Sequence, residues 1–195
     1  MNFYERQESI EMDTDLRIAV VGLGGVGYWV SKFLAMSGIN QLHLFDDDTL
    51  EIHNLNRLDL PISTLGMNKA EVAKTVIRNL RPDAVVKSVP FKFNEEFLRD
   101  KVDYIMDCTD KIESQKTIFD YAKSKYIPYL KVGYDGTHIT LANKVAGWGE
   151  SEDGYQITPS WVVPAVIVAA LAVGSVLKYF DKEVSLDISN LYMSV

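Results

Sequence analysis

Residues 16–38 have the sequence LRIAVVGLGGVGYWVSKFLAMSG, and this stretch decides the fold. Residues 16–21 form a continuous apolar run that ends at a glycine, which predicts a buried strand of a parallel sheet. Residues 25–37 repeat apolar side chains at helical spacing, and Gly38 provides the stop. The sequence therefore predicts a strand, a glycine-rich turn and a helix, the opening unit of a doubly wound α/β domain.

The turn itself is GLGGVG, with glycines at Gly22, Gly24, Gly25 and Gly27. Glycines allow a tight turn and let backbone amides approach a phosphate, and the dipole of the following helix favours the same anion. The motif lies after a predicted strand and before a predicted helix, which is the context that a nucleotide site requires. Many redox enzymes share this motif, so it does not by itself identify the nucleotide.

Residues 46–57, DDDTLEIHNLNR, separate two interpretations of the turn. Asp46 ends the predicted second strand, where a carboxylate accepts the hydroxyls of a ribose. A redox domain needs only that acid. Here a second acid, Asp48, follows, and Asn54, Arg57 and Lys69 add an amide and two cations suited to a triphosphate.

A further acidic pair, Asp107 and Asp110, follows a later predicted strand at residues 104–106. Parallel strands end at one rim of the sheet, so these acids are expected beside the same nucleotide. A carboxylate cannot bind a polyphosphate directly, and its sensible role there is to hold Mg²⁺. The combination predicts a site for attack on a nucleotide phosphate.

The rest of the chain alternates strand and helix before its pattern changes near the C-terminus. We expect one domain spanning residues 1–195, a doubly wound Rossmann-like α/β fold with a mostly parallel sheet and antiparallel C-terminal strands. The expected helix that starts at Lys69 ends before Pro82 and has Leu80 among its inward residues. Further elements are strands at 41–45, 85–89 and 129–132, helices at 94–100 and 111–125, a hairpin at 137–145, an apolar helix from residue 161 and a strand near 185–193.

Composition excludes several classes of protein. A net charge of −7 opposes a polyanionic partner, so we expect no nucleic acid substrate. The single cysteine, Cys108, leaves no internal disulfide and no Cys-rich zinc site, and the polar, acidic N-terminus lacks a secretory signal, so a cytoplasmic location is the default. The apolar run at residues 162–177 is shorter than the ~20 residues of a membrane span, which favours a buried or interface helix.

Six motifs in a fixed order resemble a known family. They are YERQ (4–7), VVGLGGVGYWV (20–30), FDDDTLEIHNLNR (45–57), GMNKAEVAK (66–74), RPD (81–83) and DYIMDCTD (103–110). Across residues 4–180 the chain resembles the ThiF/MoeB/HesA superfamily. This is the adenylating domain shared by ubiquitin-activating enzymes, by activators of sulfur-carrier proteins and by the enzyme that adenylates a microcin precursor peptide.

The resemblance implies an enzyme that transfers AMP from ATP onto the C-terminal carboxylate of a ubiquitin-like protein, sulfur carrier or peptide, releasing pyrophosphate. It implies ATP and Mg²⁺ as cofactors and a homodimer as the active form. The implied roles are ribose binding by Asp46 with Asp48 close by, phosphate contacts by Asn54, Arg57 and Lys69, Mg²⁺ coordination by Asp110, and a contribution of Arg6 to the neighbouring subunit's nucleotide.

The chain departs from the family pattern in its cysteines. Many relatives carry two CxxC pairs for zinc and a further cysteine that receives the activated carboxylate, and this sequence has neither. Cys108 lies beside Asp107, so we expect a raised thiol pKa and a structural role. The loop at 148–160, where relatives place the cysteine segment, is short and acidic, and any thioester step must then occur on another protein. Leu58 stands where the family usually has glutamine.

Two alternatives remain open from the sequence. One is a non-catalytic subunit that scaffolds an active relative in a heterodimeric activating enzyme, although Arg57, Lys69 and Asp110 are intact. The other is an NAD-dependent oxidoreductase, which only the glycine turn and Asp46 support.

Overall fold

The computed structural model describes residues 3–98, 100–145, 159–177 and 184–187. These residues form a seven-stranded sheet in the order β3-β2-β1-β4-β5-β6-β7. The first five strands in this order are parallel, and the last two pair antiparallel at one edge. The strands are β1 (Arg17–Val21), β2 (Gln41–Phe45), β3 (Val85–Val89), β4 (Tyr104–Asp107), β5 (Tyr129–Asp135), β6 (His138–Ala142) and β7 (Val184–Asp187).

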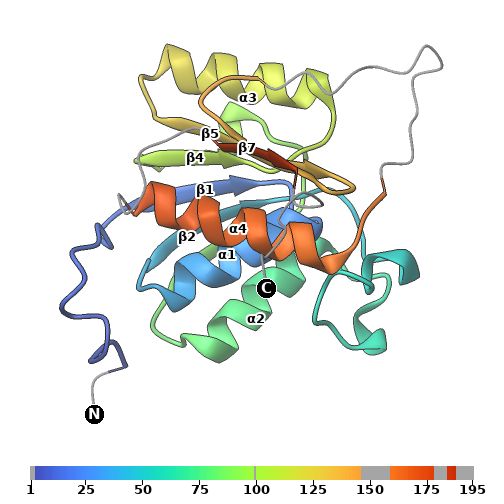
Figure 1. The fold of residues 1–195 in the computed structure, drawn as a ribbon, viewed down its shortest axis with the longest axis horizontal. Helices are drawn as coiled ribbons and strands as arrows, with labels where there is room; N and C mark the ends of the chain where they lie inside the picture. Colours follow the sequence, from blue (N-terminus) through green and yellow to red (C-terminus); the bar gives the residue numbers. More distant parts are fainter. Residues whose placement is uncertain (1–2, 99, 146–158, 178–183, 188–195) are drawn as a thin grey trace, which may run out of the picture.

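Within the described residues, four α-helices cover the two faces of the sheet (Figure 1). Helices α1, α2 and α4 pack on one face, and α3 packs on the other. This arrangement confirms the predicted doubly wound fold with a mostly parallel sheet and antiparallel C-terminal strands. The helices are α1 (Gly25–Met36), α2 (Lys69–Leu80), α3 (Ile112–Ser124) and α4 (Val162–Val176).

Strand register brings the carboxyl ends of neighbouring strands to one rim. Val21 at the end of β1 pairs with Phe45 on one side and with Asp107 on the other. Phe45 pairs with Val89, and Asp107 pairs with Lys131. The connection after β1 leads to β2 on one side of β1, and the connection after β3 leads to β4 on the other side. The strand order therefore reverses between β1 and β4. Such a switch point opens the crevice in which α/β sheets bind ligands.

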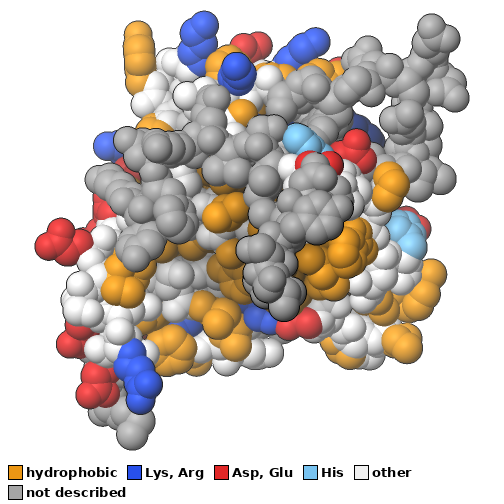
Figure 2. Space-filling view, in the orientation of Figure 1, with side chains coloured by type: hydrophobic (Ala, Val, Ile, Leu, Met, Phe, Trp, Pro, Cys, Tyr) orange, Lys and Arg blue, Asp and Glu red, His pale blue; other side chains and the backbone are white. Residues whose placement is uncertain are grey.

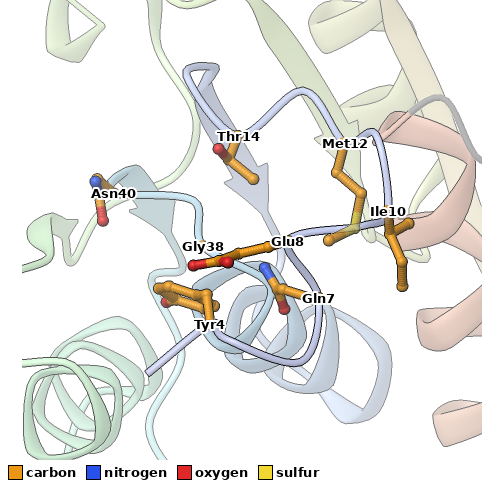
Figure 3. A pocket seen from close by; sticks show the side chains of 8 residues that line it. All are labelled: Tyr4, Gln7, Glu8, Ile10, Met12, Thr14, Gly38 and Asn40. Carbon is orange, nitrogen blue, oxygen red and sulfur yellow. The ribbon is translucent and has the colours of Figure 1, made fainter. Parts of the chain in front are cut away.

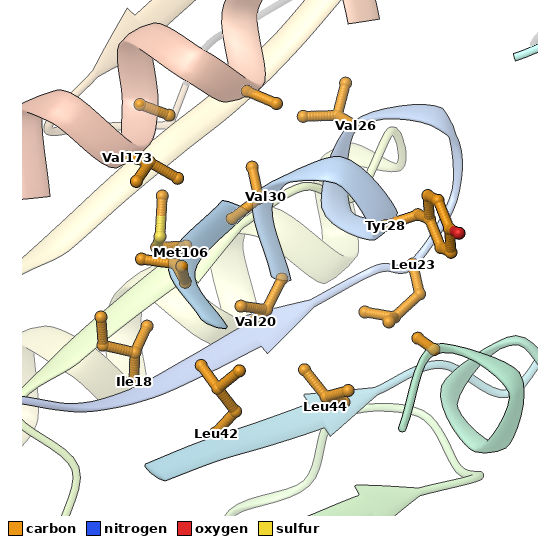
Figure 4. Close-up of a cluster of buried hydrophobic side chains, with 14 of the residues drawn as sticks. Ile18, Val20, Leu23, Val26, Tyr28, Val30, Leu42, Leu44, Met106 and Val173 are labelled. Carbon is orange, nitrogen blue, oxygen red and sulfur yellow. The ribbon is translucent and has the colours of Figure 1, made fainter. Parts of the chain in front are cut away.

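The larger hydrophobic core lies between the sheet and helices α1, α2 and α4 (Figure 4). Val20 and Leu44 from the strands and Val30 from α1 are fully buried, and Val173 from α4 packs against the same cluster. Complete burial of such a side chain stabilises the fold by ~1.5–3 kcal/mol. The smaller core on the opposite face joins Phe45 to Ile118 of α3.

Helix α4 is apolar on all sides and carries no charged residue. One side packs against α1, while Trp161, Val162 and Val163 near its start remain about 40% exposed. Figure 2 shows apolar side chains gathered over this helix on the face toward the viewer. No helix among the described residues is both long enough and apolar enough to cross a membrane.

Some predicted elements differ from the structure. The helix expected at 94–100 is only a 3-10 turn, Glu95–Phe97, which Asn94 caps through its side chain. Leu80, expected to face inward, is 39% exposed; it is the last residue of α2, and a residue at a helix end has fewer neighbours to cover it. The hairpin forms when β6 folds back on β5 around Gly136, and β7 supplies the start of the last predicted strand, of which residues 188–193 lie outside the described part.

The glycine turn depends on a close backbone contact. Gly22 has φ +85°, a conformation that favours glycine. A Cβ atom at Gly27 would lie 1.8 Å from the carbonyl oxygen of Gly22. The first turn of α1 therefore lies directly against the end of β1. At Gly24, by contrast, an added Cβ would meet no atom within 4 Å.

We predict that Gly27→Ala destabilises the protein by more than the ~1–3 kcal/mol typical of overpacking, because backbone and not a flexible side chain occupies the space. Gly24→Ala is the matched control, and its free energy of unfolding should change by less than ~1 kcal/mol. Urea unfolding followed by circular dichroism measures both. Equal stability of the two variants would contradict the close contact.

Candidate functional site

The end of β1, the glycine turn and the start of α1 form the centre of the rim. Helix α1 begins at Gly25 after Gly24, and its first turn has neither an acidic residue nor a side-chain cap. The orphan amides of such a helix end favour an anion. The four glycines of the turn therefore occupy the position at which a phosphate would be held.

Asp46 fastens the turn to the end of β2. One carboxylate oxygen accepts the Leu23 amide at 2.5 Å, and the other accepts the Asp48 amide at 2.8 Å. Burial raises the pKa of Asp46, while nearby Lys69 and the two amides act in the opposite direction. Asp46 retains 9% exposure at the rim. Asp46 lies at the end of β2, where the sequence predicts a ribose ligand. It also holds the backbone of Leu23 and Asp48, a structural role that the sequence did not indicate.

Arg57 lies directly over the glycine turn. A Cβ atom at Gly25 would be 2.8 Å from Cδ of Arg57. The guanidinium donates from Nη1 to the His53 carbonyl at 2.9 Å and to the Asn56 side chain at 3.0 Å. Indole Nε1 of Trp29 donates to the Arg57 carbonyl at 2.8 Å, which ties the loop to α1. The arginine predicted to contact phosphates is thus held where phosphates would bind.

Lys69 reaches the rim from the first residue of α2. Its Nζ is 2.9 Å from a carboxylate oxygen of Asp48, with 12% of the lysine side chain and 69% of the aspartate side chain exposed. Asn68 caps α2 and donates to the carbonyls of Asp46 and Asp48. Lys69 and Asp48, predicted separately, are therefore brought together as an ion pair beside Asp46.

Asn54 has a different environment from the one its predicted phosphate contact suggests. The side chain is 5% exposed, and its Oδ1 accepts the Glu51 amide at 3.0 Å within a 3-10 turn, Ile52–Asn54. Asn54 thus shapes the loop that carries Arg57. Leu58, the departure from the family pattern, is buried in the larger core.

Asp107 and Asp110, the two acids near Cys108, differ in burial. Asp107 is fully buried and accepts the Tyr129 hydroxyl at 2.7 Å and the Thr109 amide and hydroxyl at 2.9 and 2.7 Å. Asp110 is exposed at the rim. Only Asp110 can meet a ligand from solvent.

The donor set fits Mg²⁺. Asp110 offers an exposed carboxylate, and ligand oxygens of Asp46, Asp47 and Asp48 lie within 4.8 Å of one another. Magnesium prefers carboxylate, water and phosphate oxygens. Zinc in structural sites prefers several thiolates, and the chain has only Cys108. The rim would therefore hold magnesium through Asp110, together with the phosphates.

Cys108 has the environment expected of a structural thiol. Its amide donates to the Val21 carbonyl at 2.8 Å, and its backbone lies against Gly22. Removal from water raises the pKa of the Cys108 thiol to about 12, with Asp107 acting in the same direction. A thiol with this pKa is a poor nucleophile near neutral pH.

Arg6 lies at the opposite end of the sheet from the rim. Its neighbours Tyr4 and Gln7 bond to the carbonyls of Ala35 and Ser37 at the end of α1, beside an open hollow of about 280 Å³ (Figure 3). Helix α1 separates this end from the glycine turn by twelve residues, or roughly 18 Å. The exposed Arg6 side chain therefore cannot reach the rim of its own chain.

Sequence reasoning missed two residues that shape the site. In the sequence, Trp29 is one more residue of the apolar helical pattern at 25–37. In the structure its indole nitrogen donates to the Arg57 carbonyl and so positions Arg57. Lys131 is 1% exposed within β5, and its ammonium bonds to the backbone of the DCTD segment. A lysine within residues 129–132, a predicted strand that is otherwise apolar, is unusual, and this feature of the sequence could have identified Lys131 as a residue with a special role.

Several curated proteins are similar to this chain. The tRNA threonylcarbamoyladenosine dehydratase of Haemophilus influenzae is 32% identical over 136 residues, covering 65% of this chain and 52% of that protein. The molybdopterin-synthase adenylyltransferase of the same organism is 30% identical over 147 residues, covering 73% of this chain and 58% of that protein. The chain thus spans little more than half the length of these curated relatives.

Solved structures agree on the fold, and a family model identifies the family. Escherichia coli MccB with ATP gives a TM-score of 0.72 at 20% identity, covering 90% of this chain and 64% of that chain. PaaA gives a TM-score of 0.69 at 24% identity with the same coverage. Residues 4–150, most of the sequence, match the ThiF family. The predicted resemblance is confirmed, and the chain belongs to the ThiF family.

Proposed function

We propose that this protein is an ATP-dependent adenylyltransferase that activates the C-terminal carboxylate of a ubiquitin-like protein, sulfur carrier or peptide as an acyl-adenylate. The observation that carries the proposal is the position of Arg57 over the glycine turn. Lys69 lies at the same rim, beside Asp46 and Asp48. Relatives named adenylyltransferases support this reaction class.

The arrangement suits attack on the α-phosphate of ATP. The acceptor carboxylate attacks the α-phosphorus, a new oxygen–phosphorus bond forms, and the bond to the bridging oxygen of pyrophosphate breaks. The carboxylate is already ionised at neutral pH, so no general base is required. Arg57 and Lys69 stabilise the charge that develops on the phosphates, and Asp46 orients the ribose. Magnesium held by Asp110 would neutralise further phosphate charge.

A protein or peptide acceptor is favoured over RNA. One relative is named as acting on a modified tRNA nucleoside, but a net charge of −7 opposes binding of this chain to a polyanion. MccB, the fold neighbour, was crystallised with the peptide MccA. A redox cofactor would leave Arg57 and Lys69 without a function, and a purely scaffolding subunit would not need them.

A homodimer is part of this proposal. Arg6 is held far from the rim of its own chain, so any contribution to a nucleotide site must be made in a second subunit. The exposed apolar residues at the start of α4 offer surface for such an association.

We predict that Arg57→Ala and Lys69→Ala each reduce ATP–pyrophosphate exchange by ~10²–10³-fold, because each removes a preorganised cation from the developing charge. Exchange is measured with radiolabelled pyrophosphate and a panel of ubiquitin-like proteins and peptides. Arg78→Ala is the matched control, since it removes an exposed cation of α2 nine residues away from Lys69. Retained exchange in both rim variants would remove their catalytic assignment.

Subunit mixing tests the role of Arg6. Arg6→Ala and Lys69→Ala should each be inactive alone. After unfolding and refolding together, a mixed dimer has one intact site, formed by Lys69 of one subunit and Arg6 of the other. Random pairing of equal amounts should then restore about a quarter of wild-type exchange. An inactive mixture that contains heterodimers would argue against a shared site.

The chemistry is predicted to require no cysteine. At pH 8 a thiol of pKa about 12 is ionised to about one part in ten thousand. Native protein should therefore resist iodoacetamide until urea exposes Cys108, and its reactivity should rise as pH approaches the pKa. Cys108→Ala should retain exchange close to wild type. Rapid alkylation of native protein accompanied by loss of exchange would contradict the structural role.

A further inference from the structure

The segment that carries Asp110 leaves the sheet at the end of β4. Pairing of β4 with β5 ends at Asp107, opposite Lys131. The residues that follow leave the ladder, so the carbonyls of Thr109 and Asp110 lie beyond it; residues 107–110 are here called the 107–110 loop. Buried carbonyls need donors from elsewhere. The donors come from two buried side chains, Lys131 and Gln115.

Lys131, on the neighbouring strand β5, holds this loop through its ammonium group. Its Nζ donates to the carbonyl of Asp107 at 3.3 Å and to the carbonyl of Thr109. The same ammonium lies 3.8 Å from a carboxylate oxygen of Asp107, and both side chains are almost completely buried. Burial of a charge is unfavourable unless it is paired and hydrogen-bonded. Here the charged partner is Asp107, and the carbonyl partners belong to the loop and to Val132 of β5.

Gln115 holds the loop from the first turn of α3. Its Nε2 donates to the carbonyls of Thr109 and Asp110 at 3.4 and 3.3 Å. The residue is fully buried, and its Oε1 has no hydrogen-bond partner within the described residues. An unsatisfied buried oxygen destabilises a fold by ~1–3 kcal/mol. An apolar side chain would therefore serve packing better than this glutamine does.

The geometry points to Lys131 and Gln115 as positioning residues that fix the 107–110 loop so that Asp110 meets Mg²⁺ and ATP in a defined place. This inference rests on the proposed function, because it concerns the same site. Both residues act through backbone carbonyls and need not touch the nucleotide. Partners one step removed from a metal ligand typically change metal affinity or activity by 10–100-fold when they are replaced.

Gln115→Met gives the sharpest test because it separates positioning from stability. Methionine keeps the unbranched length, removes the unsatisfied oxygen and removes the amide that holds the loop. We expect a melting temperature without ligand close to that of wild type, because loss of the unsatisfied oxygen offsets loss of the two long hydrogen bonds. We also expect the Mg²⁺ concentration for half-maximal stabilisation by ATP, measured by thermal shift, to rise about tenfold.

Lys131 is tested in a charge-balanced variant. Lys131→Met with Asp107→Asn removes both buried charges and leaves no lone ion in the core. We expect the same shift of the Mg²⁺ midpoint, with a matching shift in the Mg²⁺ dependence of pyrophosphate exchange. Leu130→Ala is the control, because it creates a cavity on the same strand without touching the loop. It should lower the melting temperature and leave the Mg²⁺ midpoint unchanged.

The outcomes distinguish the inference from the proposed function. Wild-type protein that shows no Mg²⁺-dependent stabilisation by ATP would overturn both. Wild-type protein that responds, with Gln115→Met showing an unchanged Mg²⁺ midpoint, would overturn the positioning role alone. If the double variant does not fold, Gln115→Met still decides the question, because its expected stability is close to that of wild type.

Discussion

The close approach of Gly27 to the carbonyl oxygen of Gly22 is the constraint on which the rest of the structure depends. It sets helix α1 against the end of β1 without an intervening side chain. Helix α1 in turn carries Val30 into the larger core and Trp29 toward the loop after β2. One backbone contact therefore fixes both the packing of the sheet and the position of Arg57.

Around this turn, ionic groups are held by backbone bonds more than by each other. Asp46 accepts two amides, Asp107 accepts a third, and Arg57 donates to a carbonyl. Backbone partners have little freedom to move, so each charge has a defined direction before any ligand arrives. Preorganisation of this kind is what a reaction with little covalent work for the protein requires.

The sequence predicted the parts of the fold that depend on local pattern. Residues 41–45 and 85–89 form strands as expected: the first is almost entirely buried, and the second alternates and is rich in β-branched residues. The prediction of a helix at 94–100 was wrong: within residues 94–98 only Leu98 is buried, so the segment has no apolar face to stabilise more than a 3-10 turn. Leu80 shows that helical spacing alone does not reveal how well neighbouring elements cover the last residue of a helix.

The candidate site was predictable to a different degree. Arg57, Lys69, Asp46 and Asp48 lie at one rim, and their roles toward a nucleotide stay predictions. The division between buried Asp107 and exposed Asp110 was not visible, because it depends on Tyr129 from another strand. Trp29 and Lys131 were missed for the same reason: each acts on backbone distant in the sequence, and no spacing rule records such a contact.

The ion pair of Lys69 with Asp48 has a consequence for the entropy of binding. The Asp48 side chain is 69% exposed, so water solvates its carboxylate once a phosphate takes the ammonium, and the exchange has little cost. A free lysine side chain, by contrast, loses up to ~2 kcal/mol of rotamer freedom when a ligand immobilises it. The ion pair with Asp48 already restricts the rotamers of the Lys69 side chain before a ligand binds. Much of the ordering that an anion would otherwise have to impose is therefore complete in the empty site.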